Sequence, residues 1–142
     1  MAFDAVSSGG VGWIMEKGNT SQAAYFVGFE APIVSKTEIG YVLKNQTTYL
    51  YCDFNGTEMQ AIRTYAINQK SLYTDKNVQI YLGMGGGFWS FTNTDGSDNV
   101  LGAFNFNFGA TWHFLDFTTS IDIVPQDGAD IFMPSIGMSI VF

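Results

Sequence analysis

The side chains best able to do chemistry in this chain belong to a few charged residues. The sequence pattern predicts β-strands, and it places these residues on the face of the strands that carries small and polar side chains. A charge withdrawn from water must be paired or hydrogen-bonded. We therefore expect two cations and three carboxylates to neutralise one another in a polar network that fills the interior of the fold. A proton or ion path and a catalytic acid–base pair are the alternatives to this structural role. The five residues are Glu30, Glu38, Lys44, Arg63 and Asp122.

The single histidine, His113, is the other residue with catalytic chemistry. Ser120 and Asp122 follow on the adjoining predicted strand, so a hydrolytic serine–histidine–acid set is an alternative to examine. Alternation along the strand predicts that the His113 side chain points inward, however. The residue two positions on, which would share its face, is Leu115. We expect His113 to fill interior space, and we predict no catalytic residue.

Two predicted loops repeat an acidic pattern, Asp95-Gly-Ser-Asp98 and Asp127-Gly-Ala-Asp130. If these loops are neighbours, their four carboxylates could bind Ca²⁺ or Mg²⁺, which prefer oxygen ligands. Asp-Gly is also good turn chemistry, and we prefer this interpretation. Cys52 is the only cysteine, so an internal disulfide or a cysteine metal site is excluded. We predict no metal and no cofactor.

Strands must position these residues, and residues 103–114 have the most distinct strand pattern. Aromatic rings occupy the even positions except Ala110, whereas the odd positions hold Ala, Asn, Gly, Thr and His. Side chains alternate between the two faces of a strand, so one face is large and apolar and the other small and polar. We expect the apolar face to contact lipid through Phe104, Phe106, Phe108, Trp112 and Phe114.

Similar alternating runs recur along the whole chain, and none has helical periodicity. They predict one domain over residues 1–142, with strands near 8–16, 22–31, 37–52, 58–68, 77–91, 101–115, 117–125 and 133–142. Between them we place Gly/Asn/Asp-rich loops at one end and turns near 32–35, 70–76 and 115–116 at the other. An even number of antiparallel strands can close without an edge, as lipid requires.

The amino-acid composition indicates which face of the strands, the apolar or the polar one, lies on the outside of the barrel. Soluble chains are about 25% charged, whereas this one is 13% charged and has six Lys and Arg in 142 residues. The prediction is an all-β, eight-stranded antiparallel up-and-down transmembrane β-barrel, with a soluble barrel that carries a hydrophobic ligand as an alternative. A net charge of −7 without a basic cluster excludes nucleic acid as a partner.

The C-terminal segment Met133-Pro-Ser-Ile-Gly-Met-Ser-Ile-Val-Phe142 resembles the last strand of bacterial outer-membrane barrels. Residues 80–88, Ile-Tyr-Leu-Gly-Met-Gly-Gly-Gly-Phe, look like the fifth strand of the opacity-protein and OmpA/OmpX-like group. The resemblance implies an outer-membrane location, with the Gly/Asn/Asp-rich loops outside the cell. It also implies that the assembly machinery reads Met138, Ile140 and Phe142 during biogenesis.

These patterns together predict a monomeric, non-enzymatic outer-membrane barrel with a lumen filled by side chains and with a structural or surface-interaction role. A narrow pore and a lipid-modifying outer-membrane enzyme are the alternatives. Met1-Ala-Phe-Asp lacks the basic and apolar regions of a signal peptide. We therefore expect the sequence to start at the mature N-terminus behind an added Met.

Overall fold

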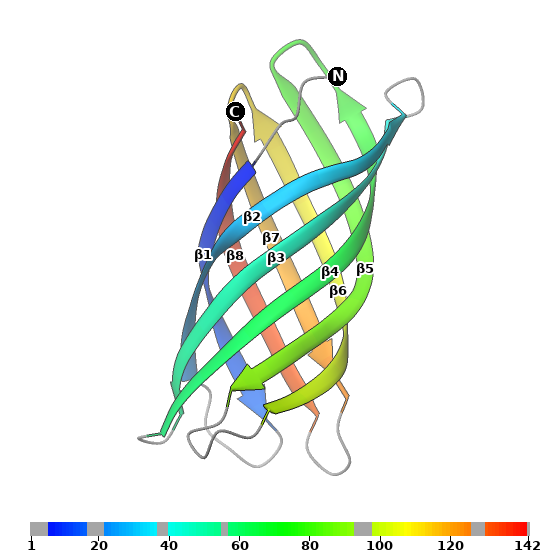
Figure 1. The fold of residues 1–142 in the computed structure, drawn as a ribbon. Coiled ribbons are helices and arrows are strands. Elements are labelled where there is room, and N and C mark those ends of the chain that lie inside the picture. Colours follow the sequence, from blue (N-terminus) through cyan, green and yellow to red (C-terminus); the bar gives the residue numbers. More distant parts are fainter. Residues whose placement is uncertain are drawn as a thin grey trace.

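Eight antiparallel strands close into one barrel in the computed structural model, as Figure 1 shows. Each strand pairs with the next along the chain, and β1 pairs with β8 to close the sheet. The structure describes residues 6–16, 22–36, 40–54, 57–92, 98–125 and 130–141. The strands are β1 (Val6–Glu16), β2 (Gln22–Lys36), β3 (Tyr41–Phe54), β4 (Thr57–Thr74), β5 (Val78–Thr92), β6 (Asp98–Trp112), β7 (Leu115–Val124) and β8 (Ile131–Val141). The predicted fold class is confirmed.

The barrel has two different ends. The connections β1–β2, β3–β4, β5–β6 and β7–β8 lie at one, which we call the loop end. The connections β2–β3, β4–β5 and β6–β7 lie at the other, the turn end, together with the start of β1 and the end of β8 (Figure 1). Among the described residues, no helix is long and apolar enough to cross a membrane.

At the turn end, two strands run further than predicted, and the third reversal comes earlier than predicted. β2 continues through Pro32 to Lys36, and β4 continues to Thr74. Register shifts at Pro32/Val34 and Ser71/Tyr73 explain why, because a β-bulge absorbs an irregular residue without ending the strand. The third reversal lies at residues 113–114, two residues before the predicted site.

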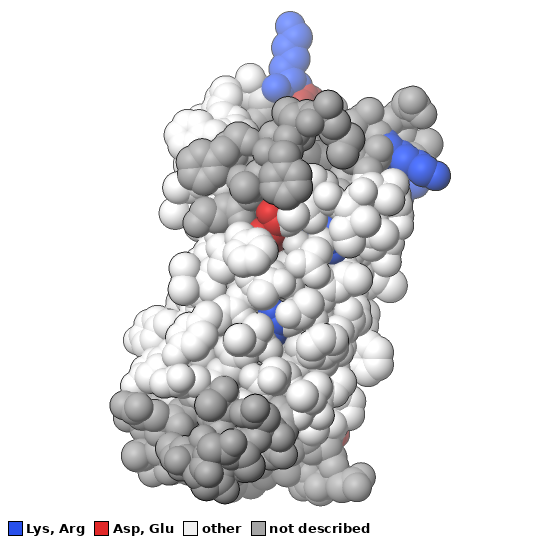
Figure 2. Space-filling model, viewed as in Figure 1, with Lys and Arg blue, Asp and Glu red and all other residues white. Residues whose placement is uncertain are grey.

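The aromatic face points away from the barrel axis. Phe104, Phe106 and Phe108 are 53%, 44% and 48% exposed, whereas Asn105 and Asn107 between them are buried. Figure 2 shows one face of the wall with only small patches of charged atoms between the uncharged side chains, whereas lysines project near the turn end. A barrel that carried a ligand inside would have the opposite orientation, so this alternative is wrong.

The interior is divided along the axis. The half nearer the turn end holds the buried charged groups Glu30, Lys44 and Asp116. The loop half is an apolar core, which corrects the expectation of a wholly polar filling. The core residues of this half include Ile14, Leu50, Cys52, Ala61, Phe91, Val124, Ile131 and Met133. An antiparallel strand whose two faces are both apolar gives no alternation of polarity, so its inner residues are hard to recognise from sequence.

Candidate functional site

Arg63 and Asp122 form an ion pair across the lumen. β4 carries Arg63 and β7 carries Asp122, and these strands are not neighbours in the sheet. Arg63 Nη1 contacts Asp122 Oδ2, and both side chains are almost fully buried, at 3% and 0% exposed. Arg63 Nε also donates a hydrogen bond to Thr48 Oγ1 at 2.9 Å, and Asn105 Nδ2 donates to Asp122 Oδ1 at 2.5 Å. Neither charge lacks a partner, as burial requires.

Aromatic rings surround the Arg63 guanidinium. Its central carbon lies 4.6 Å from the centroid of Phe26 and 5.8 Å from that of Trp89, distances at which a ring face attracts a cation. Trp89 Nε1 donates a hydrogen bond to the hydroxyl of Tyr65 at 2.6 Å. The sequence reasoning did not single out Tyr65, although alternation from Arg63 on the same strand places it inside.

A second ion pair lies nearer the turn end. Lys44 Nζ is 2.9 Å from Glu30 Oε2, and Gln46 Nε2 donates to Glu30 Oε1 at 2.6 Å. These residues come from the adjacent strands β2 and β3. The structure thus brings together four of the five predicted network residues in two separate pairs. Glu38 lies outside the described residues.

Asp116 is a buried carboxylate that the sequence reasoning missed, because it placed this residue in a turn. It is instead the second residue of β7 and faces the lumen. The hydroxyl of Tyr81 lies 2.6 Å from Asp116 Oδ1 and 2.6 Å from Thr118 Oγ1. A Cβ atom added at Gly109 would lie against the Tyr81 ring and hydroxyl. Glycine at this position therefore makes room for Tyr81 to reach Asp116.

His113 does not point into the lumen, so that prediction was wrong. It is exposed in the β6–β7 turn, has a φ of 55° and packs edge-on against Trp112. The turn leaves the strand before His113, which ends the alternation on which the prediction depended. Ser120 hydrogen-bonds Ser135 at 2.8 Å, and Asp122 pairs with Arg63. The proposed serine–histidine–acid set is therefore not assembled.

The other predicted positions are partly described. Trp112 and Phe114 are exposed, and Ile140 and Met138 face outward on β8, whereas Phe142 lies outside the described residues. Of the four loop carboxylates, Asp95 and Asp127 are also outside, and only the exposed side chain of Asp130 is described, since that of Asp98 is not. Within the described residues, no group of three His, Cys, Asp or Glu could hold a metal. The cation hypothesis for these loops stays a prediction.

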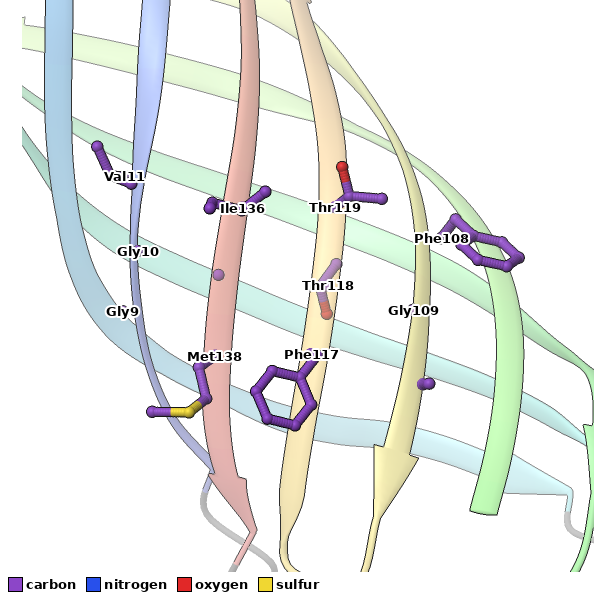
Figure 3. A pocket seen from close by; sticks show the side chains of 12 residues that line it. Gly9, Gly10, Val11, Phe108, Gly109, Phe117, Thr118, Thr119, Ile136 and Met138 are labelled. Atoms are coloured by element: carbon purple, nitrogen blue, oxygen red, sulfur yellow. The ribbon is translucent and has the colours of Figure 1, made fainter.

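The outer wall carries an apolar groove of about 600 Å³ over β1, β8, β7 and β6, shown in Figure 3. Val11, Ile136, Met138, Phe117 and Phe108 border it. The two threonine hydroxyls in its lining already have protein partners, since Thr119 donates to the carbonyl of Ser135 and Thr118 bonds Tyr81. Among the described residues that line the groove, no nucleophile has a base beside it.

Comparison with solved structures identifies the architecture. The chain resembles Neisserial surface protein A (NspA) with a TM-score of 0.71, at 13% identity over 99% of this chain and 97% of that one. It resembles the outer-membrane enzyme PagL with a TM-score of 0.68, at 15% identity over 96% and 98% of the two chains. Ail, the attachment invasion locus protein of Yersinia pestis, gives a TM-score of 0.55 at 12% identity over the full length of both.

The fold is that of the small outer-membrane β-barrels. This confirms the predicted resemblance to that group. No protein-family model and no curated protein sequence matches the chain. Outer-membrane barrels with this fold include an enzyme as well as surface and attachment proteins, so the role must be argued from the site.

Proposed function

We propose that this protein is a non-catalytic bacterial outer-membrane barrel with a sealed lumen, acting as a structural or surface-interaction component. The supporting observation is the filled interior. Leu50, Val124 and Met133 are each 0% exposed in the loop half, and the Arg63–Asp122 pair lies on the turn side of this layer. Hydrated ions do not cross a packed apolar layer, because losing their water costs far more than such a layer returns.

Planar-bilayer conductance tests the sealed lumen. The purified barrel should insert without producing current steps, while an open porin in the same membranes gives a positive control for detection. Stable steps of about a nanosiemens would overturn the proposal in favour of the narrow pore, since eight strands leave room only for their own side chains when the lumen is filled.

A lipid-modifying activity is the competing function, because one similar structure is the enzyme PagL. The position of His113 counts against it, since this side chain lies in a turn away from Ser120 and Asp122. Incubation of the folded barrel with vesicles of phospholipid and lipopolysaccharide tests the point. We expect no release of fatty acid, and time-dependent release that His113→Gln abolishes would replace our proposal by catalysis.

The charge distribution bears on the kind of surface partner. Acidic residues occupy strand ends or adjoining positions at the loop end, at Glu16, Asp53, Glu58, Asp98 and Asp130. The exposed lysines of the described residues, which are Lys36, Lys70 and Lys76, belong to the turn end. The five acidic positions along the chain form what we call the acidic rim, and a concentration of negative charge at one end of the barrel repels polyanions and attracts cations.

This rim supports a cationic rather than an anionic surface partner. Ail has been crystallised in complex with the heparin analogue sucrose octasulfate, and the present barrel should differ. Vesicles that contain the folded protein should bind polylysine in a salt-sensitive manner and should not bind heparin. Salt-sensitive heparin binding would contradict the proposed polarity.

A further inference from the structure

Polar side chains gather on the outward wall of β3 and β4, whereas the rest of the wall is mostly apolar. Asn45 and Thr47 alternate outward on β3, and Thr64, Ala66 and Asn68 do so on β4. All five lie well inside their strands, which run from Tyr41 to Phe54 and from Thr57 to Thr74. We call these five residues the polar wall patch. A barrel that spans a membrane would hold the patch against acyl chains.

The hydrogen bonds of the patch are incomplete within the protein. Thr47 Oγ1 donates to Asn45 Oδ1 at 3.1 Å, and Asn45 Nδ2 reaches the carbonyl of Tyr65 at a long 3.5 Å. Asn68 Oδ1 accepts from the hydroxyl of Tyr41. The amide donors of Asn68 and the hydroxyl of Thr64 have no side-chain hydrogen-bond partner among the described residues. Lipid tails cannot supply partners, so these groups are satisfied only by other polar groups.

We propose that the polar wall patch is the contact surface between two copies of this chain in the membrane. The inference rests on the membrane location given under Proposed function, and it replaces the expectation of a monomer. Copies inserted in the same direction are related by a two-fold axis along the membrane normal, so each residue meets residues at its own depth. An axis between β3 and β4 would set the β3 of one copy against the β4 of the other.

The patch is complementary to itself in this arrangement. Asn45 pairs in register with Ala66, and Leu43 pairs with Asn68, so Asn45 and Asn68 are diagonal neighbours. Because the strands are tilted, as Figure 1 shows, these diagonal residues lie at similar depths. Each asparagine amide carries donors and an acceptor, so Asn45 of one copy can bond Asn68 of the other in both directions. The small side chain of Ala66 between them permits close approach.

Disulfide trapping in lipid vesicles tests the contact. Ala66→Cys places a thiol next to the proposed axis, and the buried Cys52, at 0% exposure, is shielded from the oxidant. We expect copper-phenanthroline to link Ala66→Cys into dimers at low protein-to-lipid ratio. The matched control is Ile136→Cys, which is exposed on the opposite wall and should stay unlinked.

Two further substitutions in the Ala66→Cys chain distinguish a specific contact from random collision between copies in the membrane. Asn45→Leu with Asn68→Leu in the Ala66→Cys chain should reduce the linked fraction about tenfold, since symmetry removes each amide contact twice. Equal linking of Ala66→Cys and Ile136→Cys, or an unchanged yield in the leucine variant, would overturn the proposal. The proposal would also be overturned if the Ala66→Cys protein is folded and floats with the vesicles but is not linked into dimers. Failure to float with vesicles would instead refute the membrane location.

Discussion

Removing one partner of the Arg63–Asp122 pair tests the central network directly. Arg63→Met leaves the Asp122 carboxylate at 0% exposure with Asn105 and Tyr65 as its remaining side-chain hydrogen-bond partners. Breaking a buried pair from one side costs about 3–5 kcal/mol, because the other charge stays desolvated. Asp122→Leu leaves the guanidinium with Thr48 and two ring faces, so we expect a loss near the lower end of this range.

The double variant distinguishes a paired charge from ordinary packing. Arg63→Met with Asp122→Leu removes both charges, so its free energy of unfolding should fall by less than the sum of the two single losses. We expect a coupling free energy of at least about 2 kcal/mol. Urea unfolding from lipid vesicles, followed by tryptophan fluorescence, measures all four corners of the cycle. Additive losses, with coupling below about 0.5 kcal/mol, would refute the argument that these two groups neutralise each other across the lumen.

Three smaller changes are tested by the same unfolding assay. Lys44→Met should lower the free energy of unfolding by about 1–3 kcal/mol, which is less than Arg63→Met, because Glu30 is less deeply buried and keeps its hydrogen bond from Gln46. An equal loss in the two variants would contradict this ranking. His113→Gly should be neutral or stabilising by up to about 1 kcal/mol, since glycine accepts the positive φ, whereas a loss of several kcal/mol would indicate a packed side chain. Gly109→Ala should cost about 1–3 kcal/mol by crowding the tyrosine packed there, while an alanine at the outward Gly102, which has open space beside it, should cost little.

The strand phases were predictable because each face meets a different environment. A wall in lipid excludes charge, so Phe104, Phe106 and Phe108 fix the outward face of β6 and pairing carries this phase to its neighbours. Arg63 indicates the phase of β4 by the same argument, because an arginine facing lipid would be costly and must therefore point into the lumen. The position of the turn-end reversals was not predictable in this way. Bulges at Pro32 and Ser71 let the strands continue through residues that usually end them.

The partners inside the lumen were less predictable than the faces. Alternation tells which side chains enter the barrel, but their height along the axis depends on register around all eight strands. Alternation therefore could not predict that Arg63 pairs with Asp122 rather than with Glu30. The error at Asp116 has a related cause, because shifting the reversal by two residues moved this carboxylate from a turn into the wall.

The two parts of the interior have different roles, because the ion pair stabilises the barrel and the apolar layer seals the lumen. Arg63 and Asp122 hold β4 and β7 together, but the apolar layer that contains Leu50, Val124 and Met133 lies between them and the loop end. Arg63→Met should therefore weaken the barrel without opening a conducting path, because the apolar layer is left intact. Replacing Leu50 and Met133 together by serine should admit water from the loop end while the ion pair persists. Conductance in the first variant but not in the second would show that the charged network, rather than the apolar core, seals the lumen.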